Sequence, residues 1–487
     1  MVNHLLPTAL IAVLGLLFAG RVTAQTFRVL HTFTSASGPN STNTDGANPS
    51  AGLILSGNTL FGTAVYGGSS GWGTVFAVQT NGASFATRYD FTGGSDGANP
   101  YAELILSGNT LYGTARNGGS SDAGTVFAVN MDGAGFTGLH SFTATDPGGK
   151  NSDGANPHVG LILAGNTLFG AANDGGTSGK GTLFAVNPNG LGFTTLHSFS
   201  SGSGGAYSSA GLVLSGNTLY GTDYGNLGRG TVFGIRTNGT DFTNYYAFTS
   251  GNLNGNGILT NSDGANPHAR LILSGNTLYG TAEHGGSSGK GTVFAINTDG
   301  SGFTNLHSFA AGAYNSFGLY TNSDGANPSA GLALSSNTLY GTASHGGSSG
   351  NGTLFVLNTD GTGFTNLHNF TATPPYPQPQ TNRDGANPTA GLILSGTTLY
   401  GTTAYGGSSG NGTVFSLSLE SVNVIGPHLT IVPFESNVIL TWPADPGGFG
   451  LQSAPSVTGT FTNIPGAVSP YTNLISSEPQ FFRLSSN

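Results

Sequence analysis

Aspartate and asparagine recur in one pentapeptide, Asp-Gly-Ala-Asn-Pro, and in five copies a further Asn stands two residues before the Asp. Oxygen atoms of Asp and Asn around a glycine are typical ligands of Ca²⁺, which takes six to eight of them. Each copy offers a single carboxylate, however, and Asp in such turns often accepts hydrogen bonds from backbone N–H groups. We therefore favour a turn-capping role without a cofactor, and calcium stays as the alternative. The five residues are Asp45, Asp153, Asp263, Asp324 and Asp384.

A second position varies between copies while the sequence around it stays constant, and it directly precedes a Gly-rich loop. Aromatic, imidazole and amide side chains at such a position can stack on a sugar or peptide and hydrogen-bond to it. Neutral drift at an exposed position is the alternative interpretation. These candidate ligand-binding residues are Tyr66, Asn117, Asp174, Tyr224, His284, His345 and Tyr405.

Four segments that each lead into a new copy are longer than the others, namely residues 35–44, 250–262, 310–323 and 372–383. The last contains Pro-Pro-Tyr-Pro-Gln-Pro, a composition typical of extended polyproline structure. We expect the long loops to form a raised contact surface. Its aromatic candidates are Tyr314, Phe317, Tyr320 and Tyr376.

Catalytic and metal chemistry have weaker support. Hydrolysis needs paired carboxylates or a nucleophile with its base, and the non-repeated carboxylates are Asp174, Asp223 and Glu283. One repeated position carries His in five copies and Tyr in two, but equivalent positions in different copies lie far apart, so we expect packing roles rather than a shared metal. These residues are His31, His140, His197, His307, His368, Tyr89 and Tyr246.

The repeat that carries these residues predicts the fold. The pentapeptide begins at Asp45, Asp96, Asp153, Asp263, Asp324 and Asp384, and an altered copy occupies residues 204–208, which gives seven units 51 to 61 residues apart. Each unit reads as four short strands separated by Asn-Gly, Gly-Asn and Asp-Gly turns, without any helical period. In the fifth unit we expect strands at residues 269–273, 277–282, 292–296 and 303–309. This pattern predicts an all-β propeller, with the pentapeptide and the Gly-rich loop on one face of each blade.

The two ends of the array complement each other. The last copy ends after its third strand, residues 413–417, whereas residues 27–33 have the sequence of a fourth strand. We therefore predict a seven-bladed β-propeller of four-stranded blades that is closed by the N-terminal strand.

A family resemblance rests on two repeated sequence segments, Ser-Gly-Asn-Thr-Leu-Tyr-Gly-Thr-Ala and Gly-Thr-Val-Phe-Ala-Val-Asn-Thr-Asp-Gly. The chain resembles the GloVer-type tandem-repeat family of exported bacterial proteins over about 380 residues. The resemblance implies export and surface attachment, with no established activity. The sequence departs from the family pattern because it lacks a C-terminal sorting helix with basic residues.

The remaining segments lie at the two ends. Residues 1–24 combine an apolar run with a small-residue cleavage motif and predict a signal peptide, with an uncleaved anchor as the alternative. We expect a secreted or cell-surface protein. Residues 25–422 form the predicted propeller. Residues 423–487 are predicted to form a small immunoglobulin- or fibronectin-like module, with short strands at 429–432, 437–442, 450–453, 461–464 and 481–484. Adhesion or attachment is its functional interpretation, and a passive cap is the alternative.

Charge limits the partners that we expect. The net charge is −9, and the chain has 12 Lys and Arg and no Cys, which disfavours nucleic acid, disulfides and thiolate metal sites. We expect a monomer, without a membrane span in the mature chain, that acts as a non-enzymatic binding or adhesion scaffold for a glycan or protein. The alternatives are a structural surface repeat without a discrete pocket and a polysaccharide hydrolase or lyase.

Overall fold

The structure is a computed structural model. It describes residues 25–38, 41–200, 211–225, 229–253, 258–316, 318–374, 380–419, 430–434, 437–441, 449–455, 460–465, 467–468, 470–474 and 480–486. The chain divides into two compact units, one formed by Gln25–Leu419 and a second that contains the strands after Glu420. The predicted signal peptide, the altered repeat copy at 204–208, Phe317 and Tyr376 lie outside the described residues.

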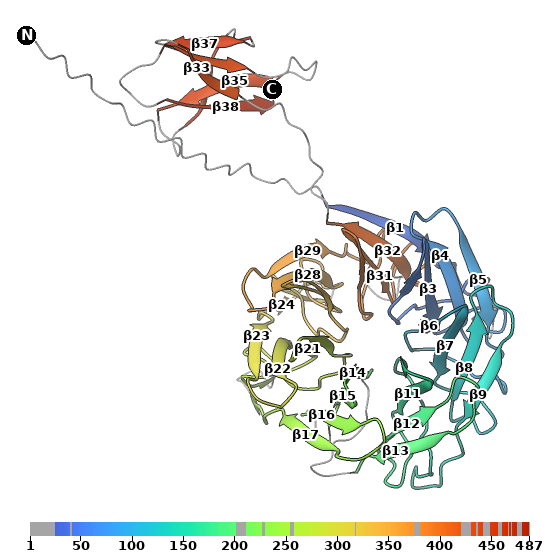
Figure 1. The fold of residues 1–487 in the computed structure, drawn as a ribbon. Helices are drawn as coiled ribbons and strands as arrows, with labels where there is room; N and C mark the ends of the chain where they lie inside the picture. Colours follow the sequence, from blue (N-terminus) through green and yellow to red (C-terminus); the bar gives the residue numbers. More distant parts are fainter. Residues whose placement is uncertain are drawn as a thin grey trace, which may run out of the picture. The chain divides into compact units, whose positions relative to one another are not determined.

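The larger unit is built from four-stranded antiparallel sheets, seven of which lie in the described part of the chain. No helix occurs among the described residues. We call each of these sheets a blade. The blades follow one another around a common centre in a propeller-like arrangement (Figure 1).

The strands recur in a fixed order within each blade. The first strands are β2 (Ile54–Ser56), β6 (Ile105–Ser107), β10 (Ile162–Ala164), β14 (Val213–Ser215), β20 (Ile272–Ser274), β26 (Ala333–Ser335) and β30 (Ile393–Ser395). The second strands are β3 (Thr59–Ala64), β7 (Thr110–Ala115), β11 (Thr167–Ala172), β15 (Thr218–Asp223), β21 (Thr277–Ala282), β27 (Thr338–Ala343) and β31 (Thr398–Thr403). The third strands are β4 (Thr74–Gln79), β8 (Thr125–Asn130), β12 (Thr182–Val186), β16 (Thr231–Arg236), β22 (Thr292–Asn297), β28 (Thr353–Asn358) and β32 (Thr413–Ser418). The fourth strands are β5 (Phe85–Asp90), β9 (Thr137–Ser141), β13 (Thr194–Ser198), β17 (Thr243–Ala247), β23 (Thr304–Ser308) and β29 (Thr365–Asn369), and the last blade takes β1 (Thr26–Thr32) as its fourth strand.

The pairing of β1 confirms the prediction that the N-terminal strand completes the last copy. It runs antiparallel to β32, from Thr26 opposite Ser418 to Thr32 opposite Thr413. The last blade also bonds directly to the first, because Thr402 Oγ1 donates a hydrogen bond to the Ala51 carbonyl at 3.1 Å.

The fifth copy shows where the predicted boundaries hold and where they fail. The strand predicted at 277–282 is β21, and those predicted at 292–296 and 303–309 agree with β22 and β23 within one residue at each end. The first strand was predicted to begin at residue 269, but β20 begins at Ile272. Residues 269–271 instead line a central cavity.

A repeated pair of phenylalanine rings joins neighbouring blades. The ring of Phe142, which directly follows a fourth strand, packs edge-on against Phe184 in the third strand of the next blade, with ring centroids 5.4 Å apart. Both rings are fully buried. Phe33 and Phe76 make the same contact at 5.3 Å between the last blade and the first. The hydrophobic core therefore continues from the last copy into the first.

Two of the lengthened loops form small hairpins. They are β18 (Asn252–Leu253) with β19 (Leu259–Thr260), and β24 (Ala313–Tyr314) with β25 (Tyr320–Thr321). The loop at 35–44 contains an isolated antiparallel bridge between Ser37 and Thr42.

The C-terminal unit contains two three-stranded sheets. One is formed by β33 (Thr430–Phe434), β34 (Asn437–Thr441) and β37 (Tyr471–Leu474), and the other by β35 (Phe449–Ala454), β36 (Thr462–Asn463) and β38 (Phe481–Ser486). Strand β37 was not among the predicted strands.

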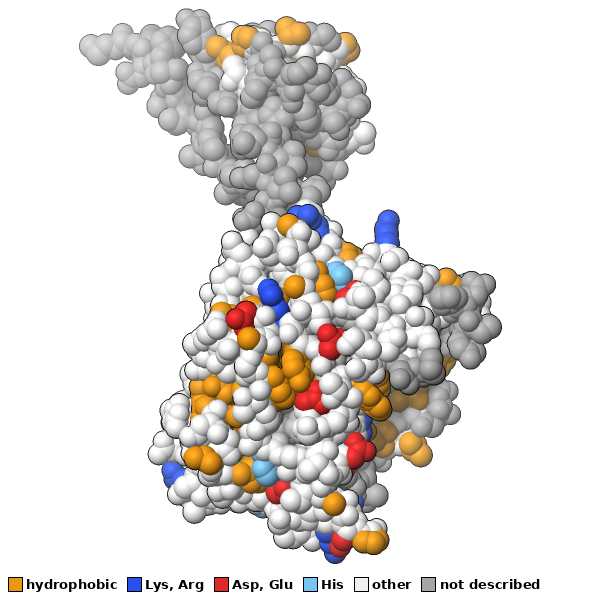
Figure 2. Space-filling model, turned by 90° about the vertical axis from the view of Figure 1, so that its right-hand side faces the viewer, with side chains coloured by type: hydrophobic (Ala, Val, Ile, Leu, Met, Phe, Trp, Pro, Cys, Tyr) orange, Lys and Arg blue, Asp and Glu red, His pale blue; other side chains and the backbone are white. Residues whose placement is uncertain are grey.

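Charged side chains are sparse on the surface that Figure 2 shows. Lys, Arg, Asp and Glu appear singly among uncharged atoms, and no basic patch is visible on this side. Among the residues described, none lies in a helix long and apolar enough to cross a membrane.

Candidate ligand-binding face

The pentapeptide and the Gly-rich loop of a blade lie on the same face, because their backbones pair with each other. The Ala47 N–H donates to the Tyr66 carbonyl at 2.7 Å, and the Tyr66 N–H donates back to the Ala47 carbonyl at 3.1 Å. The same bridge recurs at Ala98–Asn117, Ala155–Asp174, Ala265–His284, Ala326–His345 and Ala386–Tyr405. This arrangement was predicted, and we call the surface the loop face.

The pentapeptide aspartates, which were the calcium candidates, accept hydrogen bonds from the preceding blade. Asp153 Oδ2 lies 3.0 Å from His140 Nε2 and accepts the Thr143 N–H at 3.0 Å. Asp263 accepts a hydrogen bond from the Tyr246 hydroxyl at 2.9 Å. In the described residues, no group of three or more His, Asp and Glu side chains is arranged to hold a metal ion. The remaining pairs are His31–Asp45, His307–Asp324, His368–Asp384 and Tyr89–Asp96.

The Asn two residues before the Asp is engaged in the same way. Asn43 Oδ1 accepts the N–H groups of Gly46 and Gly68 at 2.9 and 2.8 Å, so it holds the pentapeptide against the Gly-rich loop. The repeated motif therefore links blades and loops, and the fourth-strand His and Tyr are its partners except at His197, which precedes the altered copy with Gly204 in place of Asp. Sequence reasoning gave these His and Tyr packing roles and missed their bonds to Asp.

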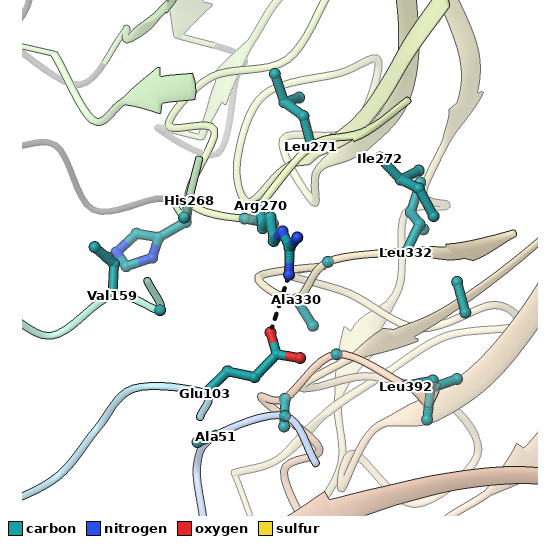
Figure 3. A pocket seen from close by; sticks show the side chains of 18 of the residues that line it. Ala51, Glu103, Val159, His268, Arg270, Leu271, Ile272, Ala330, Leu332 and Leu392 are labelled. Atoms are coloured by element: carbon teal, nitrogen blue, oxygen red, sulfur yellow. Dashed lines mark ion pairs between the residues drawn. The ribbon is translucent and has the colours of Figure 1, made fainter. Parts of the chain in front are cut away.

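A cavity of about 690 Å³ lies at the centre of the blades, lined by the residues that follow each pentapeptide proline. The third residue after the proline position is Gly in five copies, Glu in the second and Arg in the fifth. The side chains of Glu103 and Arg270 approach across the cavity, with Oε2 3.7 Å from Nη1 (Figure 3). They form an ion pair between two blades that are not adjacent in the chain.

Glycines on the neighbouring blades leave room for these two side chains. A Cβ atom at Gly52 would lie 3.2 Å from Glu103 Cδ, and one at Gly211 would lie 3.4 Å from Arg270 Cβ, Cγ and Cδ. Burial raises the pKa of the Glu103 carboxyl, and the Arg270 guanidinium opposes this rise. Among the described residues that line the central cavity, Glu103 therefore supplies one carboxylate, and Arg270 favours its charged form.

In three copies, the first residue after the proline carries a ring that lines the same cavity, namely Tyr101, His158 and His268. His158 and His268 line it with ring centroids 6.5 Å apart, and Tyr224 lies edge-on to His268 at 5.7 Å. Burial lowers the pKa of both histidines, and Glu283 opposes this effect at His268. Both imidazoles are therefore mainly neutral at pH 7 and can each donate and accept a hydrogen bond.

A second cavity of about 620 Å³ lies between the first blade and its neighbours and is lined by Tyr66, Trp72, Asn48, Asn99 and Asn411 together with small residues. Tyr66 and Trp72 remain 44% and 46% exposed. The Tyr66 hydroxyl lies 3.0 Å from the hydroxyl of Tyr101, which lines the central cavity. This tyrosine pair therefore stands between the two cavities.

The pKa of Tyr101 is raised to about 12, first by burial and then by the hydrogen bond with Tyr66. Arg116 opposes this rise, with Cζ 5.6 Å from the centre of the Tyr101 ring. Tyr101 therefore keeps its proton at neutral pH and stays available as a hydrogen-bond donor.

The other predicted ligand-binding residues are spread over the loop face. Tyr405 is 50% exposed but lines neither cavity. His284 Nδ1 lies 3.9 Å from Glu283 Oε2. Burial lowers the pKa of His345, and Lys290 and His284 add to this effect. Asn117 and Asp174 occupy the equivalent position in the second and third blades without lining either cavity.

The long-loop aromatics gather beside the fifth and sixth blades. Tyr314 and Tyr320 lie edge to face with ring centroids 5.5 Å apart, and Lys290 Nζ lies 3.8 Å from the centre of the Tyr320 ring. Burial lowers the pKa of Lys290. These contacts hold the hairpin of β24 and β25 against the Gly-rich loop that carries Lys290.

The non-repeated carboxylates do not meet in either cavity. Asp223 is a fully buried strand residue whose carboxylate accepts a hydrogen bond from the Thr231 hydroxyl. Asp174 and Glu283 are absent from the described residues that line the two cavities. Within those linings, Glu103 is the only carboxylate.

Sequence reasoning found Tyr66 but missed Trp72, Tyr101, Glu103 and Arg270. The signal was present, because each of these residues occupies a repeat position where the copies differ. The position of Trp72 holds Ala, Lys, Arg, Lys, Asn and Asn in the other copies, and the position of Tyr101 holds Ser, His, Ser, His, Ser and Thr. The three-dimensional arrangement of the loops was needed to show that these positions face a cavity.

Comparison with known proteins gives a family match. Residues 13–226, 148–319 and 312–428 match the model of the Gloeobacter/Verrucomicrobia repeat. No curated protein sequence shows a significant match.

Solved structures similar to the chain are distant. A putative 6-phosphogluconolactonase from Bacteroides uniformis is 15% identical, with a TM-score of 0.41 over 87% of this chain and 98% of that chain. An oligogalacturonate lyase in complex with manganese is 11% identical, with a TM-score of 0.43 over 81% and 96% of the two chains. A puromycin-hydrolyzing peptidase from Mycobacterium tuberculosis is 11% identical, with a TM-score of 0.44 over 86% and 63%. At these values the likenesses support no argument about activity.

Proposed function

The chain belongs to the Gloeobacter/Verrucomicrobia repeat family, and from this premise we propose that Gln25–Leu419 is a closed seven-bladed β-propeller that binds a glycan through its loop face and catalyses no reaction. One observation carries the proposal. The loop face combines a repeated backbone with side chains that differ between copies, and some of these side chains, including Tyr66 and Tyr101, line two cavities that adjoin at the Tyr66–Tyr101 pair. Rigid sites with a few polar and aromatic groups are typical of small-ligand recognition.

The arrangement of carboxylates supports a binding role over catalysis. Glycoside hydrolases that use two carboxylates need them on either side of the scissile bond. Among the described residues that line the cavities, the single carboxylate of Glu103 already faces Arg270. The pentapeptide Asp and Asn oxygens accept protein hydrogen bonds, which favours a site without a cofactor.

We further propose that the protein is exported as a monomer. Residues 1–24 act as the signal peptide in this proposal and place the protein outside the cell or on its surface. The two three-stranded sheets of the C-terminal unit form an immunoglobulin- or fibronectin-like module that serves adhesion or attachment. A net charge of −9 and scattered cations disfavour nucleic acid as a partner (Figure 2).

An array of neutral and acidic glycans, followed by a pull-down of proteins, tests the proposed function. Two variants carry replacements that other copies tolerate at the same repeat position, Tyr101→Ser and His268→Ser. The control is Leu191→Ala, because Leu191 is exposed in the turn between β12 and β13, at the opposite ends of the strands. We expect a glycan to bind wild type and the control, and to bind both cavity variants more weakly. A blank array and a blank pull-down overturn the proposal, and capture of a protein alone replaces it with protein binding.

A further inference from the structure

The cavity beside Tyr66 and Trp72 differs from the central cavity in its chemistry. The described residues that line it include serine hydroxyls, asparagine amides and two large aromatic rings, with no charged side chain and no Leu, Ile, Val or Phe. A charged ligand would lose its hydration there without gaining a counter-ion. A peptide anchor would find no apolar pocket of the kind that interface hot spots fill.

The two aromatic rings are held in place before any ligand arrives. The indole of Trp72 packs against the backbone of Gly93, where a Cβ atom would lie only 2.6 Å from the indole Nε1. The Tyr66 hydroxyl is hydrogen-bonded to Tyr101. Fixed rings with nearly half of their surface exposed provide stacking area at little entropic cost.

The polar groups of this cavity are also positioned by the backbone. Asn48 Nδ2 donates to the Ala404 carbonyl at 2.8 Å, Asn99 Nδ2 to the Val65 carbonyl at 3.0 Å, and Asn411 Nδ2 to the Thr34 carbonyl at 2.6 Å. These bonds hold three amide groups in fixed orientations around the rings. Fixed amides and serine hydroxyls can exchange hydrogen bonds with the hydroxyl groups of a sugar.

Two features of the first copy contribute to this cavity. Trp72 is the single aromatic residue at its repeat position, and the lengthened loop at 35–44 adds Ser35, Ala36 and Ser41 to the lining. The volume of about 620 Å³ lies within the usual range for small-ligand sites.

We propose that this cavity is a subsite for an uncharged carbohydrate, with the sugar ring stacked on Trp72 and Tyr66 and its hydroxyls bonded to the asparagine amides. The inference rests on the proposed glycan-binding function and deepens it by naming the ligand class. The repeat unit supplies matched replacements, because other copies carry Asn at the positions of Trp72 and Tyr66.

The test compares uncharged polysaccharides, such as a β-glucan and a mannan, with polyuronates by affinity electrophoresis and calorimetry. The protein variants are Trp72→Asn, Tyr66→Asn and Tyr405→Asn, and the last is the control because Tyr405 shares the repeat position of Tyr66 but does not line the cavity. We expect an uncharged polysaccharide to bind wild type and the control equally and to bind Trp72→Asn at least tenfold more weakly. Thermal unfolding checks that each variant is folded.

Fluorescence supplies a second readout. Trp72 and Trp442 are the two tryptophans of the chain, so in a Trp442→Phe background Trp72 is the sole tryptophan reporter. We expect the uncharged ligand to change its emission. The subsite proposal is overturned if an uncharged glycan still binds both Trp72→Asn and Tyr66→Asn, or if only polyuronates or proteins bind. In either case the proposal of a ligand-binding loop face stands. No binding to any probe overturns the subsite and the proposed function together.

Discussion

His31 Nε2 lies 2.9 Å from Asp45 Oδ2, and this contact joins the strand that completes the last blade to the pentapeptide that leads into the first. Asp45 also accepts the Thr34 N–H at 3.0 Å and the Thr34 hydroxyl at 2.5 Å. The same pairing between His and Asp links other neighbouring blades, as in His307–Asp324 at 3.0 Å. The pentapeptide therefore fixes the junction between consecutive copies, including the junction between the two ends of the array.

We predict that His31→Ala destabilises the protein more than His197→Ala. Both imidazoles stack on a phenylalanine, His31 on Phe85 at 3.6 Å and His197 on Phe242 at 3.8 Å, so the lost packing is similar. Only His31 bonds to a pentapeptide Asp, because the copy after His197 has Gly204 in place of Asp. The free energy of unfolding should fall by about 1.5–3 kcal/mol more for His31→Ala, the usual range for a hydrogen bond to a charged group. Urea denaturation measures the difference, and equal losses in both variants would contradict the junction role.

Stability should decrease in acid because of the pentapeptide aspartates. Burial raises the pKa of Asp153 and Asp384, but hydrogen bonds from histidine and threonine outweigh it and hold both values below the ordinary range. The unfolded chain, with an Asp pKa of about 3.9, binds these protons more readily. The stabilisation is therefore complete above about pH 5 and is lost as the pH falls through about 4 toward the folded-state pKa values.

Urea denaturation midpoints between pH 7 and pH 2 measure this loss. Asp153→Asn serves as the matched variant, since it should be less stable at pH 7 and lose less stability on acidification. A urea midpoint that stays the same from pH 7 to pH 2.5 would show that the hydrogen bonds to these aspartates do not stabilise the folded state.

The Glu103–Arg270 pair predicts an effect of opposite sign. Burial raises the pKa of Glu103, and Arg270 opposes this rise. The substitution Arg270→Gly should therefore raise the pKa of Glu103 further. At pH values between the Glu pKa of the unfolded chain, about 4.3, and the higher pKa of Glu103 in the folded variant, the folded state binds more protons than the unfolded state. Arg270→Gly should therefore become more stable as the pH is lowered from 7 to 5. The chain has five Glu residues, which makes carboxyl NMR titration practical.

The repeat provides the control for this pair. Glycine occupies the same position in five copies, so the double variant Glu103→Gly and Arg270→Gly restores the repeat pattern. A double-mutant cycle at pH 7 should give a coupling of about 0.5–1 kcal/mol, as for partly exposed ion pairs. Additive single losses would mean that the two side chains act independently.

Much of the fold was predictable because its signals are local. Gly-Asn and Asp-Gly turns mark the ends of strands such as β21 and β22, and residues 27–33, which have the sequence of a fourth strand, identified β1 as the partner of β32. The predicted start of β20 was wrong by three residues because a strand-like segment such as 269–273 does not reveal where hydrogen-bonded pairing begins. Strand β37 was missed, and because it has no repeated counterpart in the chain, no comparison between copies could reveal it.

The candidate site was less predictable because its contacts join residues of different copies. Tyr66 and Tyr101, whose hydroxyls are in contact, are 35 residues apart in the sequence, and Glu103 and Arg270 belong to the second and fifth copies. Variation between copies marked the position of Tyr66, and the same criterion applied to every repeat position would have marked Trp72 and Glu103. It would not have shown which of these side chains meet, since that depends on how the blades close around their centre.

The glycine in each second strand has a packing role that substitution can test. A Cβ atom at Gly113 would lie 2.7 Å from Phe127 Cζ and 2.7 Å from Leu104 Cδ2, and both neighbours are fully buried. Gly113→Ala should therefore cost about 1–3 kcal/mol through overpacking. Gly138 in strand β9 is the matched control, because a Cβ atom there meets nothing within 4 Å. Gly138→Ala should be neutral or stabilise by about 0.4–1 kcal/mol through the unfolded state. Equal effects in urea denaturation would mean that the phenylalanine ring can move aside, and the second-strand glycine would then not be required by its packing.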